Sequence, residues 1–130
     1  MSKLKNTPAR GARMLPMSAE VYLLRRNVMN VLYEIKNRGI VIPRIEVRIV
    51  DTSNAQKGLM GYAYTLKNII HIAQKWALVP SLTLKCLVLH EVLHAVKGTQ
   101  HVDGCPLMAA TLQKIESEES IWTAFEKYLK

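Results

Sequence analysis

The chain has 130 residues, which is enough for one hydrophobic core and a single domain. Hydrophobic residues make up 49% and charged residues 22%, and no apolar run approaches the roughly 18 residues of a membrane helix. We therefore expect a globular protein without a membrane partner. No apolar segment follows the basic residues at the N-terminus, so we also expect no secretory signal and a cytoplasmic location.

The net charge of +8 is concentrated near the N-terminus, where the first 26 residues carry six basic side chains against Glu20. Residues 1–17 lack periodicity and contain two prolines, which predicts a flexible basic arm before a single domain at residues 18–130. Such an arm favours binding to nucleic acid or to another acidic partner, because binding releases counterions. A solvated arm that aids solubility is the favoured alternative, because no aromatic residue precedes Tyr22 to stack on bases.

The first predicted helix begins at an N-cap on Ser18 and ends at Gly39. Its apolar residues recur at helical spacing, which predicts one buried stripe: Val21, Leu24, Val28, Leu32 and Ile35. The basic residues on the other face are expected to be a solvated surface: Arg25, Arg26 and Lys36.

A strand and a hairpin are predicted next. Residues 45–49 alternate with the two-residue period of a half-buried strand. After a polar loop through Gly58, residues 59–64 and 69–73 form the two strands of the hairpin, with residues 66–68 near the turn. The sequence does not decide which of these strands lies at the sheet edge. His71, on the second one, is expected to be a half-exposed structural histidine.

A connector at residues 74–80 precedes a long helix that Ser81 or Thr83 is expected to cap and that runs to about Lys97. This helix is apolar nearly all round, which is typical of a central, buried helix. Beyond it, residues 109–115 are predicted to be helical. A closing amphipathic helix then follows the acidic run at residues 116–119, with apolar positions Ile121, Trp122, Phe125 and Leu129.

Within the long helix, residues 90–94 match H-E-x-x-H, the zinc-binding pattern of metalloproteases. His90 and His94 lie about 40° apart and one turn along, so both rings reach one ion. Glu91 lies one position further round and is placed to act as a general base on a water. Burying these three side chains in an apolar helix costs free energy unless a metal binds to them.

A catalytic zinc site usually has three protein ligands, and His101 is the natural third. Gly98 is able to adopt a left-handed conformation and end the helix, after which the chain returns toward the ion. Two groups of alternatives remain. The acidic residues Glu116, Glu118 and Glu119 resemble the later glutamate ligand of thermolysin-like enzymes, and Cys105 or Asp103 would close a four-ligand structural site.

The run from His90 to Met108 resembles the zincin metallopeptidases, in particular the metzincins, whose signature is H-E-x-x-H-x-x-G-x-x-H followed by a methionine-containing turn. Met108 corresponds to that turn. The chain departs from the signature by one extra residue before Gly98, which rotates the helix exit by about 100°. The SprT-like proteases are a second resemblance, and the similarity covers about residues 58–110.

The resemblance implies an α+β, zincin-like fold: an N-terminal helix, a small twisted mixed sheet with a hairpin, a central metal-binding helix and C-terminal helices. It also implies a zinc-dependent endopeptidase that binds one Zn²⁺ per chain through His90, His94 and His101, with Glu91 as general base for a zinc-activated water. An extended peptide or protein substrate would pair with a strand at the rim of the cleft, either residues Gly61, Tyr62, Ala63 and Tyr64 or residues 69–72.

Two further functions stay open at this point. One is a non-catalytic zincin-like module that binds zinc structurally or associates with nucleic acid. The other, suggested by the SprT-like resemblance, is a protease that acts on protein bound to nucleic acid.

Overall fold

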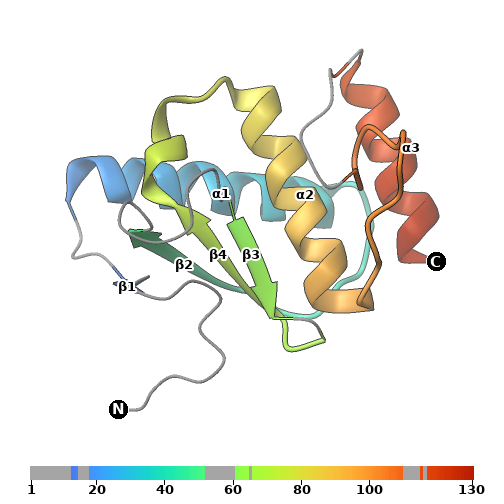
Figure 1. Ribbon diagram of the computed structural model, residues 1–130, viewed down its shortest axis with the longest axis horizontal. Helices are drawn as coiled ribbons and strands as arrows, with labels where there is room; N and C mark the ends of the chain where they lie inside the picture. Colours follow the sequence, from blue (N-terminus) through green and yellow to red (C-terminus); the bar gives the residue numbers. More distant parts are fainter. Residues whose placement is uncertain (1–12, 15–17, 52–60, 65, 110–114, 116) are drawn as a thin grey trace.

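The computed structural model describes residues 13–14, 18–51, 61–64, 66–109, 115 and 117–130. These residues form a mixed α+β fold with three α-helices, a short 3-10 helix and a four-stranded sheet (Figure 1). The mixed α+β class predicted from the sequence is therefore confirmed. No helix in this part of the chain combines the length and apolar character needed to cross a membrane.

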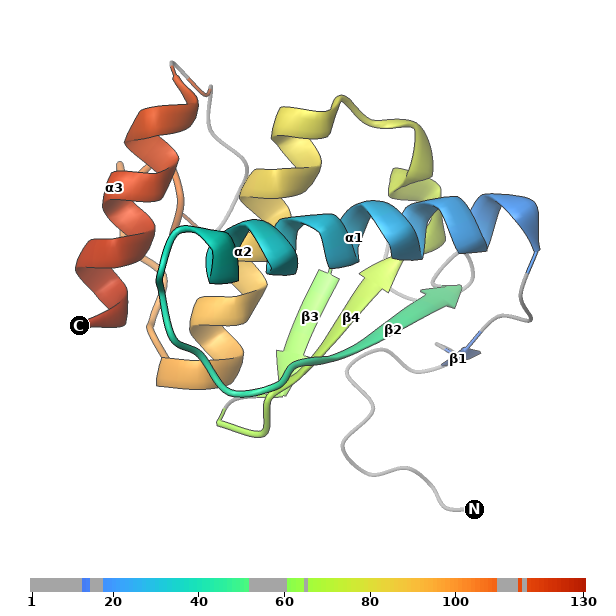
Figure 2. The same cartoon turned by 180° about the vertical axis from the view of Figure 1, so that it is seen from behind.

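Helix α1 spans Ala19–Asn37 and begins as predicted, because the Ser18 hydroxyl accepts a hydrogen bond from the Val21 amide at 3.2 Å. Gly39, with φ of 79°, follows the C-cap. The apolar stripe is buried at Val21, Leu24, Val28 and Ile35 as predicted, but Val31 is the fifth buried residue, and Leu32 is only partly buried. In Figure 2 this helix passes in front of α2, and in Figure 1 it passes behind, so the two helices cross.

The sheet has the order β1-β2-β4-β3 and is mixed, as predicted. Strand β2 (Glu46–Asp51) pairs in parallel with β4 (Ile69–Ala73), whereas β3 (Gly61–Tyr64) pairs antiparallel with β4 as the hairpin prediction requires. The order settles which hairpin strand is the edge. Strand β3 lies at one edge of the described sheet, and β4 lies between two partners.

Strand β1 (Arg13–Met14) falls within the segment expected to be a flexible arm. It pairs antiparallel with β2, with Arg13 opposite Asp51 and Met14 opposite Val50. These two residues are therefore attached to the domain by backbone pairing. Residues 1–12 and 15–17 lie outside the described residues, so the flexible arm and its contact with nucleic acid remain predictions there.

Helix α2 spans Ser81–Lys97, but its start differs from the prediction. Neither Ser81 nor Thr83 is the N-cap; Pro80 takes that position with extended backbone and no capping side chain. The proline ring fixes φ near −65° and so directs the chain into the helix without a cap. Before Pro80, the connector is ordered as a 3-10 helix (η1) over Gln74–Leu78.

Helix α3 spans Glu118–Leu129 and confirms the closing amphipathic helix, which Ser117 caps. The helix predicted at residues 109–115 is not formed at its two ends, Ala109 and Ile115, and residues 110–114 lie outside the described residues. All three α-helices and the inward residues of β2 and β4 share one hydrophobic core. Its largest fully buried side chains include Trp122, Phe125, Leu24, Ile70 and Leu89.

One ion-pair network connects the three α-helices at the edge of this core. The Lys85 ammonium on α2 lies 2.7 Å from the Glu34 carboxylate on α1 and 2.6 Å from the Glu118 carboxylate on α3. Burial lowers the pKa of Lys85, but the hydrogen bonds to Glu118 and Glu34 outweigh this and leave the pKa raised. The network therefore fixes how α1 and α3 sit against the helix that carries the H-E-x-x-H motif.

Candidate metal centre

Helix α2 brings His90 and His94 together as the four-residue spacing predicts. Their ring centroids lie 4.7 Å apart and their Nε2 atoms 3.1 Å apart. Both rings are partly buried, in a helix that is otherwise apolar on nearly every side. The first two predicted ligands therefore face the same point.

His101 reaches the same point from the loop after α2. Gly98 ends the helix in the left-handed conformation, with φ of 67° and ψ of 23°, and its amide donates to the His94 carbonyl at 3.0 Å. The loop then places the His101 Nε2 3.1 Å from the His94 Nε2. It compensates for the extra residue before Gly98, so the longer spacing does not separate the third histidine from the other two.

The ligand atoms of His90, His94 and His101 all lie within 4.8 Å of one another. Nitrogen ligands about 2.0–2.1 Å from a tetrahedral zinc ion are separated by about 3.3 Å, close to the two shorter distances in this cluster. His101 is exposed, whereas His90 and His94 are partly buried. The cluster thus opens to the surface on the loop side.

The backbone determines which nitrogen of the His90 ring carries the proton. The His90 Nδ1 lies 2.6 Å from the Leu107 carbonyl oxygen, which only accepts hydrogen bonds, so Nδ1 is the donor and Nε2 keeps a lone pair. The backbone of Thr99 raises the pKa of His94 and so partly offsets the effect of burial.

The lone pair of His90 faces the His94 Nε2 at 3.1 Å, so a proton or a cation between these two nitrogens would stabilise the pair. Burial, the largest cause, lowers the pKa of His90 to about 4, partly offset by the bond to Leu107. Burial likewise lowers the pKa of His94. Both rings are neutral at pH 7 and ready to coordinate a metal, so the donor set fits a zinc ion.

The predicted methionine turn lies directly against this cluster. Met108 is fully buried, and its carbonyl accepts a hydrogen bond from the Val102 amide at 2.8 Å, which closes the loop that contains His101. The same turn provides the Leu107 carbonyl that orients His90. Met108 is therefore part of the core next to the loop that contains His101, and its structural role in the site remains a prediction.

Glu91 lies next to His90 on α2 and is only 6% exposed. None of the residues that the structure describes hydrogen-bonds its carboxyl group. Burial raises the pKa of Glu91 to about 8, so the carboxyl group holds a proton at neutral pH in the absence of a nearby positive charge. A buried carboxyl group without a polar partner in the described part of the chain is costly and points to a functional role.

Among the described residues, none of the alternative ligands is brought to the cluster. Glu118 binds Lys85 and the Trp122 indole, Glu119 is exposed, and Glu116 lies outside the described residues. The Cys105 thiol accepts from the Met108 amide at 3.3 Å, and neither it nor Asp103 belongs to the metal-ligand group found among the described residues.

Of the two hairpin strands, β3 lies at the edge of the described sheet and β4 lies inside it. Residues Gly61, Tyr62, Ala63 and Tyr64 form β3, the edge strand, which packs next to α2 (Figure 1). His71 on β4 is 6% exposed, so the expectation of a half-exposed side chain was wrong. Its neighbours Ile70 and Ile72, which point to the opposite face of the sheet, are also buried, so both faces of β4 are covered.

Sequence reasoning missed the backbone group that orients His90, namely the Leu107 carbonyl. A carbonyl carries no signature in the sequence, since every residue has one. The only signal in the sequence was the predicted methionine turn, because Leu107 directly precedes Met108.

Comparison with protein-family models, with curated proteins and with solved structures found no significant match to this chain.

Proposed function

We propose that the protein is a zinc-dependent endopeptidase with a zincin-like site. One observation carries the proposal: three imidazole rings converge, and the Leu107 carbonyl directs the Nε2 lone pair of His90 toward the point it shares with His94 and His101. A cation at that point would be held by three ring nitrogens and would neutralise the lone pairs that converge on it. His90, His94 and His101 would hold it.

A bound zinc ion would supply a Lewis acid that polarises the reacting carbonyl and water, and a positive charge that favours the carboxylate form of Glu91. Glu91 would then act as the general base. Its carboxylate oxygens would accept a proton from the attacking water and return it to the nitrogen of the leaving amine. The buried environment strengthens this role, because burial keeps the proton affinity of the carboxylate high.

The number of histidines favours catalysis over a structural metal site. Structural zinc sites have four protein ligands, whereas catalytic sites usually have three and leave a position for water or substrate. Among the described residues the cluster contains three ligands, and neither Asp103 nor Cys105 joins it. The exposure of His101 also gives the reactants a route from solvent.

The zincin-like fold and the peptide substrate form part of the same proposal. Strand β3 of the hairpin lies at one edge of the described sheet and packs against α2. An edge strand presents unpaired backbone N–H and C=O groups, to which an extended peptide adds as a further strand. Residues Gly61–Tyr64 would hold the substrate backbone in this way.

The test compares Glu91→Gln with the zinc-loaded wild type on an unstructured protein substrate such as casein. The variant is expected to keep its zinc and to lose cleavage, because the amide has no proton affinity to act as a base. Glu119→Gln, an exposed acidic residue outside the cluster, is the matched control and should cleave normally. Wild-type cleavage rates in Glu91→Gln would overturn the proposal.

A further inference from the structure

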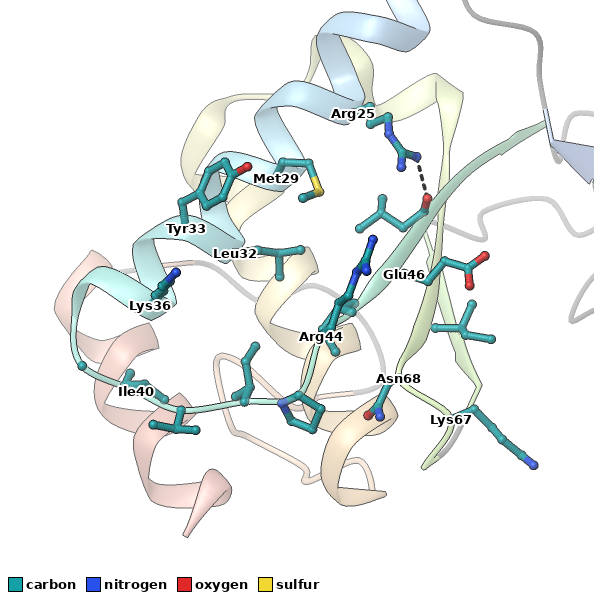
Figure 3. Close-up of a pocket in the computed structure, with 17 residues that line it drawn as sticks. Arg25, Met29, Leu32, Tyr33, Lys36, Ile40, Arg44, Glu46, Lys67 and Asn68 are labelled. Atoms are coloured by element: carbon teal, nitrogen blue, oxygen red, sulfur yellow. Dashed lines mark hydrogen bonds between the residues drawn. The ribbon is translucent and has the colours of Figure 1, made fainter.

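A large hollow lies between α1, the segment at residues 39–47 and the β3–β4 turn (Figure 3). Its volume is about 1090 Å³, which is the size of a peptide-binding or ligand-binding pocket. None of the three clustered histidines lines it. The hollow is therefore separate from the candidate metal centre.

The walls of the hollow carry an excess of positive charge. Its lining includes four basic residues, Arg25, Lys36, Arg44 and Lys67, and a single acidic residue, Glu46. Figure 3 shows the Arg44 side chain rising into the hollow, whereas the Glu46 carboxylate points away from it. Glu46 is also bound to Arg48, 2.6 Å away and outside the lining, so its charge is already compensated.

The basic residues are available to a ligand. Lys36, Arg44 and Lys67 are exposed, and none of them forms an ion pair with another residue in the described part of the chain. Arg25 donates to the Val47 carbonyl at 2.6 Å, which orients its guanidinium group at the rim. Like charges gathered around one hollow repel one another, and an anionic group would relieve that repulsion.

Apolar side chains form the rest of the lining. Met29 and Leu32 of α1 and Ile40 and Ile42 of the following segment face the hollow while packing on the core. Tyr33 and Val41, which also line it, are 57% and 91% exposed. Large apolar side chains left in water beside a concave, charged rim are typical of a protein-binding surface.

We propose that this hollow is a docking site for an acidic segment of a partner protein, one whose carboxylates meet the basic rim and whose apolar side chains cover Tyr33 and Val41. The apolar lining favours a peptide over nucleic acid. Tyr33 is the only aromatic side chain among the lining residues, so bases have no row of rings on which to stack.

The site is tested by fluorescence anisotropy with a labelled peptide rich in glutamate and leucine. Wild type is expected to bind it, with an affinity that falls as salt is added. Arg44→Glu should weaken binding at least about tenfold, since a reversed charge repels the peptide. Tyr33→Ser should also weaken it. Arg26→Glu is the matched control, because Arg26 is exposed on the same helix but does not line the hollow.

Three outcomes would overturn the proposal. One is the absence of peptide binding to wild type. Another is equal weakening by Arg44→Glu and Arg26→Glu, which would mean that net charge alone attracts the peptide. The third is tighter binding of labelled single-stranded DNA than of the peptide, with the DNA affinity lost in Arg44→Glu, which would assign the hollow to nucleic acid. Circular dichroism confirms that each variant is folded.

Discussion

The Nδ1 atom of His90 lies 2.6 Å from the carbonyl oxygen of Leu107, and the two residues are 17 positions apart in the chain. This contact joins the helix that carries the H-E-x-x-H motif to the turn that contains Met108. It turns the ring so that Nε2 faces the other two histidines. The geometry of the candidate metal centre therefore depends on the loop after α2 as much as on the helix itself.

The first prediction concerns the tautomer of this ring. In the metal-free protein at pH 7, His90 should be neutral and protonated on Nδ1, because the Leu107 carbonyl accepts that proton. Long-range ¹H–¹⁵N NMR distinguishes the two nitrogens. A ring protonated on Nε2 would contradict the assignment and would direct a proton, not a lone pair, at His94.

Gly98 is expected to control both stability and metal binding. Gly98→Ala should reduce the free energy of unfolding by about 1–2 kcal/mol, since a side chain is disfavoured at its positive φ. Zinc affinity should fall as well, because the loop to His101 starts there. Gly98→Asn is the control, as asparagine tolerates this conformation. Urea unfolding and zinc titration measure the two effects, and an alanine variant that matches wild type would refute the prediction.

The elements specified by local signals were predictable from the sequence. The Ser18 cap and the apolar spacing located α1, and the four-residue spacing predicted that the rings of His90 and His94 lie together. Features that depend on distant segments were not predictable. The parallel pairing of β2 with β4 places β4 inside the described sheet and leaves β3 at its edge, and no local pattern indicates that pairing.

The same distinction applies to side chains on the surface of α1. Arg25 and Lys36 were expected to form a solvated face, and the helix periodicity alone supports nothing more. The structure places both in the wall of a hollow, because the chain after Gly39 returns past α1 on its way to β2. Periodicity identifies which face of a helix is polar, but it does not reveal what lies opposite that face.

The Lys85 network should contribute measurably to stability. Lys85→Met keeps the apolar stem but removes the ammonium group that binds Glu34 and Glu118, and we expect a loss of about 1 kcal/mol in urea unfolding. Because the pKa of Lys85 is raised in the fold, this contribution is present at neutral pH and is lost as the pH rises past 10.5. Lys36→Met, at an exposed position on α1, is the control; equal losses in the two variants would contradict the role of the network.

His71 should make the fold sensitive to acid. Burial, with a smaller effect from Arg48, lowers its pKa from 6.5 to about 4, so the unfolded chain binds a proton that the native state does not. Stability should therefore fall as the pH drops from about 6.5 to about 4. In metal-free protein, His71→Phe should show a shallower decline over this range than wild type, measured by urea unfolding at several pH values. Identical pH profiles would exclude His71 as the cause.

The most direct test of the metal centre is the zinc content of purified protein, measured by elemental analysis on wild type, His101→Ala and Glu116→Ala. The three-histidine site predicts one zinc ion per chain in wild type and in Glu116→Ala, and a strongly reduced content in His101→Ala. Wild-type protein that binds no zinc, or a His101→Ala variant that retains it while Glu116→Ala loses it, would contradict the site described above.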